Sequence, residues 1–365
     1  MANNFLGLYI HIPFCFRKCP YCDFYSVKHT QEKEQLYVDA IIRNLKSFKP
    51  QKLCIDTVYF GGGTPSVLNP KSLEKILNAI TENFNIAENP EITLECNPAT
   101  IKEFSPLRSI GINRLSFGIQ SCVDSELKTL GRLHNYSEAE KTVFSAFKSG
   151  FENISCDLMI GTVGQTMESL VYSIDTLSRL PVKHISAYML KIEPSTPYNR
   201  PEIINSVPDE DTTADFYLET VSRLKSHSFL QYEISNFAVK GFESRHNLKY
   251  WNCDEYIGIG CSAHSYFNNV RYAVPRDIES FISSPIQKTE ITDSAPNHFE
   301  EKAMLRLRLC DGFDFSEFPE ESDHVIKKAE QLEKYGLVKI NGNFISLTPK
   351  GFLVSNSIIE EIIFE

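Results

Sequence analysis

Short apolar runs alternate six times with helical patterns over residues 1–190. The runs have the length and composition of buried strands, and the segments between them repeat apolar residues every three to four positions. The predicted strands are residues 6–12, 55–60, 91–96, 114–119, 154–160 and 184–190. The predicted helices are residues 31–48, 71–84, 101–110, 125–130, 137–149 and 168–180. Six consecutive βα units predict a parallel sheet with right-handed crossovers.

Two parallel folds fit this pattern, an open doubly wound sheet and a barrel. Both place the functional site at the carboxyl ends of the strands. An open sheet gathers the functional groups at one switch point, whereas here each of the first five predicted strands is followed by cysteine, glycine or polar residues. We therefore predict an α/β fold with a partial (β/α)6 barrel.

The regular alternation stops after residue 190. Residues 191–297 contain a turn-rich exit, a predicted helix over 211–226, a strand-like run over 231–237 and an aromatic motif over 245–251. Helical patterns over 300–308 and 325–335 then precede a small hairpin and a final helix from about residue 351. The predicted domains are a barrel core (1–190), a region that covers the barrel (191–297) and a winged-helix-like α+β module (298–365).

The composition is that of a soluble globular protein, with 42% hydrophobic and 23% charged residues. The net charge of −10 argues against a general nucleic-acid binder, so we predict no nucleic-acid partner, although winged-helix modules often bind DNA. Seven of the ten cysteines are scattered, and neither a transmembrane run nor a secretory signal pattern is evident. These features predict a reducing, cytoplasmic setting.

Three cysteines follow the first predicted strand within eight residues: Cys15, Cys19 and Cys22. Their thiolates suit three irons of a [4Fe–4S] cluster and leave the fourth iron open, because fully protein-ligated clusters use four cysteines. A structural zinc site would need a fourth ligand, and His11 falls inside the predicted strand. Three unrelated buried cysteines are a further alternative. An iron–sulfur cluster is the interpretation that we favour.

Polar and glycine residues follow the next four predicted strands. The Gly61-Gly62-Gly63-Thr64 run lacks the lysine of a phosphate-binding loop, and its glycines let the backbone approach a ligand closely. Glu95 ends the third strand, where a buried carboxylate needs a hydroxyl, an amino group or a barrel arginine as its partner. Arg132 suits a carboxylate, and Asp157 suits a ribose hydroxyl. Each residue carries little weight alone, but together with Gln120 they surround the predicted barrel mouth.

The cysteine motif, the preceding strand and the glycine run together resemble the radical S-adenosylmethionine (SAM) superfamily. The resemblance implies a partial barrel, a cluster held by three cysteines, and SAM bound to the open iron through its amino and carboxylate groups. The residues that it implies around SAM are Tyr9, Gly62, Gly63, Thr64, Glu95, Gln120, Arg132 and Asp157. It also implies an electron donor, because an electron entering the cluster cleaves SAM to a 5′-deoxyadenosyl radical.

Within that superfamily, the chain is most similar to the oxygen-independent coproporphyrinogen III oxidase family, which has two branches. The true oxidases convert propionates to vinyl groups by radical decarboxylation. They carry a longer N-terminal extension and a further cysteine two residues after the last ligand. Here Phe24 stands at that position, and only eight residues precede Tyr9. The second branch, the HemW-type haem chaperones, carries the motifs Tyr-Cys-Asp-Phe and His-Asn-x-x-Tyr-Trp, which residues 21–24 and 246–251 match.

The second branch implies a haem site within residues 191–297. The candidate haem-binding residues are His246, Tyr250 and Trp251. A neutral imidazole suits haem iron, and aromatic rings stack on the macrocycle. The basic residues that would meet the haem propionates are Arg245, Lys249 and Arg271, and a second histidine candidate is His264. The alternative is a surface histidine beside aromatic residues that pack on the barrel.

We therefore predict a cytoplasmic protein that binds a [4Fe–4S] cluster, SAM and haem or a related porphyrin. It would pass haem to an acceptor protein, with peripheral membrane contact during delivery, and would lack coproporphyrinogen oxidase activity. The first alternative is a coproporphyrinogen III oxidase of porphyrin biosynthesis. The second is a cluster-binding regulator that uses residues 298–365 on nucleic acid, and the acidic charge balance argues against it.

Overall fold

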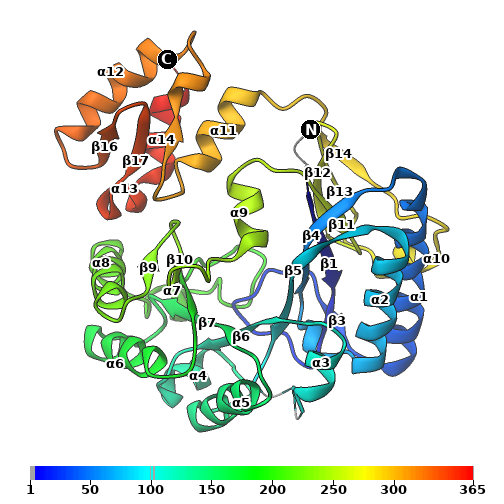
Figure 1. The fold of residues 1–365 in the computed structure, drawn as a ribbon. Helices are drawn as coiled ribbons and strands as arrows, with labels where there is room; N and C mark the ends of the chain where they lie inside the picture. The colour runs from blue at the N-terminus through cyan, green and yellow to red at the C-terminus, as the bar shows by residue number, and fades with distance from the viewer. Residues whose placement is uncertain (1–4, 99, 102, 365) are drawn as a thin grey trace.

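A sheet with seven neighbouring parallel strands forms the centre of the computed structural model, which describes residues 5–98, 100–101 and 103–364 (Figure 1). In sheet order these strands are β11 (Tyr256–Ile259), β1 (Leu6–Ile12), β4 (Cys54–Gly62), β5 (Asn85–Cys96), β6 (Arg114–Gln120), β7 (Asn153–Ile160) and β8 (His184–Met189). The predicted α/β class with parallel strands is confirmed. The curved, open sheet is consistent with a partial barrel.

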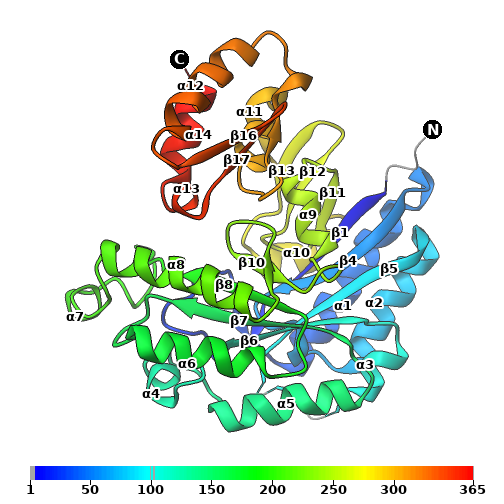
Figure 2. The same cartoon turned by 60° about the vertical axis from the view of Figure 1, so that its left-hand side comes forward.

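Helices cover the outer face of this sheet, as Figures 1 and 2 show. They are α1 (Gln31–Ser47), α2 (Pro70–Asn83), α3 (Ser105–Ser109), α4 (Asp124–Thr129), α5 (Tyr136–Lys148), α6 (Met167–Ser178) and α8 (Glu210–Ser226). The side chains of Thr30, Asn69, Asn135 and Thr166 cap the first turns of α1, α2, α5 and α6, which fixes where these helices begin. The predicted helix over 101–110 is shorter than expected, and residue 102 lies outside the described residues.

Residues on the strands alternate between an apolar outer face and a polar inner face. In β1, Leu8, Ile10 and Ile12 are completely buried among apolar residues, and Tyr9 and His11 point to the inside. The inward-facing positions of the following strands are Thr57, Tyr59, Thr93, Glu95, Arg114, Ser116, Ser155, Asp157, His184 and Ser186. The interior of the curved sheet is therefore lined with hydrogen-bonding side chains, which suits a polar ligand.

Antiparallel strands extend the sheet at both edges. Beyond β11 lie β12 (His264–Phe267), β13 (Val270–Ala273) and β14 (Glu290–Asp293), and beyond β8 lie β10 (Asn236–Ala238) and β9 (Leu230–Gln231). The prediction of one strand over 231–237 is wrong, because β9 and β10 pair antiparallel with each other and the chain reverses between them. β11 was not predicted as a strand, although it pairs in parallel with β1.

The C-terminal part is a separate α+β layer around a three-stranded sheet in the order β15-β17-β16. Its elements are α11 (His298–Arg306), β15 (Phe313–Asp314), a 3-10 turn (Phe315–Glu317), α12 (Ser322–Glu333), β16 (Val338–Asn341), β17 (Phe344–Leu347), α13 (Pro349–Leu353) and α14 (Ser355–Ile363). In its core, the rings of Phe313 and Phe318 stack, and Phe299 packs edge-on against both. The predicted final helix is divided into α13 and α14 at Val354.

Short elements complete the fold: β2 (Phe14–Cys15), β3 (Val27–Lys28), α7 (Pro201–Ile204), α9 (Arg245–Trp251), α10 (Ile278–Ser283), and 3-10 turns at Lys49–Gln51 and Pro65–Val67. The α9 helix lies between the sheet and the C-terminal α11 (Figures 1 and 2). Among the described residues, no helix has both the length and the apolar character needed to span a membrane.

Candidate functional site

The cysteine loop leaves the carboxyl end of β1 and is closed at its base by the pairing of β2 with β3. Cys15, Cys19 and Cys22 are free thiols and half-buried. Burial raises the pKa of Cys15 and of Cys22, a negative charge on Cys19 raises both pKa values further, and the Lys18 ammonium opposes the rise. The three sulfurs thus lie within electrostatic reach of one another. Crowded thiols that are partly open to solvent are a donor set that suits a cluster.

Among the described residues, no three His, Cys, Asp or Glu side chains already converge as ligands of a single metal ion. Each cysteine of a cubane cluster binds a different iron, so a cluster does not require the three sulfurs to meet at one point. The residues present therefore fit the [4Fe–4S] group that the motif predicts.

The glycine run after β4 lies directly against the start of the cysteine loop. The amide of Gly63 donates to the carbonyl of Ile12 at 2.8 Å, and that of Thr64 donates to the carbonyl of Phe14 at 2.8 Å. The hydroxyl of Thr64 is 3.4 Å from the Cys15 sulfur. The two motifs that are separated in the sequence therefore form one surface at neighbouring strand ends.

Glu95 points from β5 into the interior, where its two oxygens have different partners. Tyr59 donates its hydroxyl to Oε1 at 2.9 Å, and the amide of Gly62 donates to Oε2 at 3.2 Å. Gly62 has a φ of +113°, and a Cβ there would lie 2.5 Å from the His11 ring, so only glycine fits. Burial raises the pKa of Glu95 to about 7, and nearby Asp157 adds to the rise. Glu95 is thus a carboxyl group poised to take a cationic partner.

Gln120, Arg132 and Asp157 converge around Gly118. A Cβ added to Gly118 would lie 3.0 Å from Gln120 Nε2, 3.3 Å from Arg132 Nη2 and 3.8 Å from Asp157 Oδ2. Gln120 has a φ of +79° at the point where the pairing of β6 with β7 shifts register, and this bend ends β6. Arg132 donates to the Gly118 carbonyl and, at 3.4 Å, to the Cys19 sulfur. The arginine therefore links this group to the cysteine loop.

Three interior residues lie at the site although the sequence analysis proposed none of them around SAM, His11 having been considered only as a zinc ligand. Tyr59 orients Glu95, as described above. His11 contacts the Tyr9 hydroxyl through Nδ1 at 3.1 Å, and burial lowers the pKa of His11 to about 4, so it is neutral. Arg114 is only 1% exposed, and its positive charge opposes the rise that burial causes in the pKa of Glu95 and of Asp157. The sequence signal that could have identified them is that each is a polar residue at an inward-facing position of an alternating strand pattern.

We expect the Glu95→Gln variant to change how the stability of the cofactor-free protein depends on pH. The folded pKa of about 7 lies above the ordinary value of 4.5, so the folded protein binds this proton more tightly than the unfolded chain does. Between pH 4.5 and 7 the wild type should lose stability relative to Glu95→Gln, by roughly 3 kcal/mol in total. Urea unfolding at several pH values measures this difference, and a constant difference would contradict the burial of a proton-binding Glu95.

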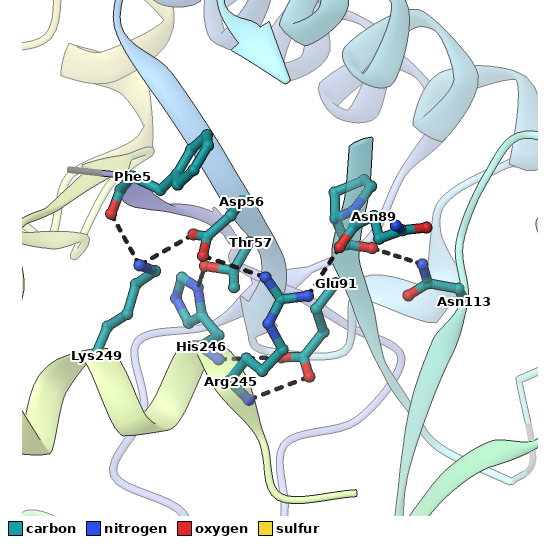
Figure 3. A network of polar contacts seen from close by, with 10 residues as sticks. Phe5, Asp56, Thr57, Asn89, Glu91, Asn113, Arg245, His246 and Lys249 are labelled. Atoms are coloured by element: carbon teal, nitrogen blue, oxygen red, sulfur yellow. Dashed lines mark hydrogen bonds and ion pairs between the residues drawn. The ribbon is translucent and has the colours of Figure 1, made fainter. Parts of the chain in front are cut away.

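The predicted haem motif forms α9, which closes the amino-end of the barrel interior (Figure 3). His246 is completely buried, its Nδ1 lies 2.8 Å from the Thr57 hydroxyl and its Nε2 lies 2.8 Å from the Tyr250 hydroxyl. Burial lowers the pKa of His246 to about 3. Its ring stacks on Tyr59 at a centroid distance of 5.1 Å and an angle of 25°. In this arrangement both ring nitrogens have partners.

Acidic side chains of β4 and β5 hold α9 in place. Glu91 accepts hydrogen bonds from the backbone amides of Arg245 at 3.1 Å and His246 at 3.0 Å, which caps the helix amino-terminus (Figure 3). Asp56 pairs with Arg245 at 3.2 Å and with Lys249 at 3.0 Å. We predicted that Arg245 and Lys249 would bind the haem propionates. In this structure both side chains are instead paired with Asp56.

The remaining residues proposed for haem lie apart from this network. Arg271 pairs with Glu301 of α11 and lies 4.6 Å from the centroid of the Tyr266 ring. Trp251 is half-buried at the end of α9. His264 is exposed at the start of β12. Partial desolvation of its ring, together with the smaller effect of the Arg276 charge, lowers its pKa. Of the two histidines proposed for haem, only His264 is open to solvent.

Comparison with protein families identifies the class to which this site belongs. A model described as the radical SAM superfamily matches residues 9–177, and one described as the HemN C-terminal domain matches residues 293–354. The fold is similar to that of coproporphyrinogen III oxidase (HemN) from Escherichia coli, a radical SAM enzyme, with a TM-score of 0.86, 22% identity, and coverage of 99% of this chain and 90% of that one. The chain therefore has the radical SAM fold.

Its relatives define the family more narrowly. The heme chaperone HemW of Lactococcus lactis is 33% identical over 98% of this chain and 97% of its own length. The heme chaperone HemW of Bacillus subtilis is 33% identical over 96% and 97%, and that of Escherichia coli is 31% identical over 99% and 98%. The chain therefore belongs to the HemW family.

Proposed function

We propose that this protein binds a [4Fe–4S] cluster and SAM, and carries haem for transfer to an acceptor protein. The observation that carries the proposal is the cysteine loop seated on a ring of polar strand ends, in a chain that matches proteins named heme chaperones over nearly its whole length. Cys15, Cys19 and Cys22 would hold the cluster. When bound, the cluster would supply one electron to SAM.

The residues around the strand ends would each have a role in holding SAM. Glu95 would accept a hydrogen bond from the SAM amino group, because burial raises the pKa of its carboxyl group and a bound cation would offset the cost of burying the charge. Arg132 would attract the SAM carboxylate, and Asp157 would accept from a ribose hydroxyl. Gly62, Gly63 and Thr64 would provide backbone and hydroxyl contacts at the cluster side. Tyr9 and Gln120 would complete the walls of the SAM site.

Haem binding by His246, Tyr250 and Trp251 is part of this proposal, and it requires a movement. His246 must give up the Tyr250 hydroxyl before its Nε2 reaches iron, whereas its Nδ1 can keep the contact with Thr57. Because the ring is completely buried, α9 or the rings packed around it must also move to admit haem. His264 is the second candidate, and it needs no such release because it is exposed. The two histidines therefore make different demands on the fold, which makes them separable by mutation.

A haem titration of the anaerobically reconstituted protein, followed by mixing with apomyoglobin, tests the proposed function. We expect stoichiometric haem binding and transfer to apomyoglobin, with no protoporphyrinogen formed from coproporphyrinogen III in the presence of SAM. The His246→Asn variant, which still offers a partner to Thr57, should alter the haem spectrum if His246 is the ligand, and His264→Ala should do so if His264 is. Steady turnover of coproporphyrinogen III would establish the oxidase instead, and failure to bind haem would end the chaperone proposal.

A further inference from the structure

A hollow of about 720 Å³ lies beside the cysteine loop, on the side of α4 and α5. Its walls come from the loop itself and from the connection between α4 and α5. Lys18 and Pro20, the two neighbours of Cys19 in the chain, both line it, and so does Arg132, which donates to the Cys19 sulfur. A molecule seated in this hollow would therefore be next to the Cys19 corner of the cluster.

The hollow is positively charged although the chain as a whole carries a net charge of −10. Four cations line it (Arg17, Lys18, Lys128 and Arg132) against two carboxylates (Asp124 and Glu138), a difference of +2. The carboxylates are engaged at helix starts, where Asp124 accepts from the amide of Tyr136 at 2.8 Å and Glu138 from that of Asn135 at 2.9 Å. Within the described part of the chain, Lys18 and Lys128 form no ion pair.

Apolar side chains accompany these charges at the surface. Leu133, which lines the hollow, is 46% exposed. Phe16, which precedes Arg17 in the loop, is 53% exposed, but its ring packs edge-on to His29 and does not line the hollow. Exposed apolar residues among cations are typical of surfaces that bind another protein. The combination favours a protein partner with an acidic surface over a small inorganic anion.

The wall beside the cysteine loop is held in a fixed position. Arg17 donates to the Gly131 carbonyl at 2.5 Å, and a Cβ at Gly131 would lie 2.8 Å from Pro20, so the loop packs tightly on the α4 connection. A partner thus meets a preformed surface, and the Cys19 corner lies directly behind that surface.

We propose that this hollow docks an acidic one-electron carrier protein that reduces the cluster, an inference that rests on the proposed cluster at Cys15, Cys19 and Cys22. One electron leaves the reduced carrier, which is oxidised, and enters the cluster, which passes from the 2+ to the 1+ state. Lys18 and Lys128 attract the acidic face of the carrier, and Leu133 packs against it. Cys19, whose two chain neighbours line the hollow, would then be the cluster ligand that lies next to the docked carrier.

The test uses the reconstituted full-length protein and a reduced acidic flavodoxin as the probe. Stopped-flow spectroscopy gives the second-order rate constant of cluster reduction, and calorimetry gives the Kd of the oxidised flavodoxin. We expect Lys128→Glu to lower the rate and weaken the Kd about tenfold at low salt, with the effect shrinking as salt screens the charges. The matched control is Lys327→Glu, an exposed lysine on α12, which should change both values less than twofold.

Photoreduced 5-deazaflavin, a small uncharged reductant, separates the two proposals that are being tested. It should reduce the clusters of wild type and Lys128→Glu at equal rates. If the cluster cannot be assembled or reduced by deazaflavin, the proposed function itself fails. If deazaflavin reduces it normally but flavodoxin reduction is insensitive to Lys128→Glu, or equally sensitive to Lys327→Glu, the docking surface is overturned and the proposed function stands.

Discussion

Replacing Cys19 with alanine is expected to abolish cluster binding. Three cysteines already leave one iron of a cubane without a protein ligand, so losing Cys19 leaves a second iron without one and only two cysteines to hold the cluster. Cys19 is also the cysteine that accepts from Arg132, so its loss removes the link between the loop and the Gly118 group. After anaerobic reconstitution, the iron and sulfide contents should fall below about a tenth of the wild-type values.

The control for this variant is Cys54→Ala, at the start of β4 and far from the cysteine loop in the sequence, whose sulfur accepts a hydrogen bond from the Asn85 side-chain amide at 3.7 Å. It should retain full iron content. A second readout uses the cluster-free protein, in which a charge on Cys19 raises the pKa of Cys15 and Cys22. Removing Cys19 should therefore shift their alkylation to lower pH. Full iron retention in Cys19→Ala would show that the ligand assignment is wrong.

The central part of the fold could be predicted from the sequence because each strand buries one apolar face. β1 occupies Leu6–Ile12 as predicted, and the ends of the next five strands agree to within a few residues, with β5 beginning earlier than expected. In a parallel sheet every strand end faces the same edge, so the pattern also predicted that Glu95, Gln120 and Asp157 would share a region. The local periodicity of apolar residues therefore predicted both the fold class and the region in which these side chains lie.

Contacts between distant segments could not be predicted in the same way. β11 has four residues, one of them glycine, and it exists because it pairs with β1 almost 250 positions earlier. The sequence predicted His246 as a haem ligand, but its ring contacts Thr57, 189 positions away, and its backbone amide donates to Glu91, 155 positions away. A single sequence contains no local signal for such pairings.

The His246→Ala variant is expected to destabilise the cofactor-free protein by roughly 3 kcal/mol. The substitution leaves the buried Thr57 hydroxyl and the Tyr250 hydroxyl without the partner that both now share, and it opens a cavity under the Tyr59 ring. Urea unfolding with circular dichroism measures the loss. His246→Asn should recover part of it by restoring a partner to Thr57, and His264→Ala, at an exposed position, should cost less than about 1 kcal/mol.

The pH dependence of this loss distinguishes a buried neutral histidine from a loosely held one. The folded pKa of His246, about 3, lies below its ordinary value of 6.5, so the unfolded chain binds this proton more tightly than the folded protein does. The wild type should therefore gain stability over His246→Ala as pH rises from 4 to 6.5, and the difference should be constant above that. The stability difference for His246 thus changes with pH in the opposite direction to the difference for Glu95. The two measurements therefore separate the contribution of His246 from that of Glu95. Equal stability of His246→Ala and wild type at pH 7 would mean that α9 does not close the barrel, and that His246 is available to haem without any release.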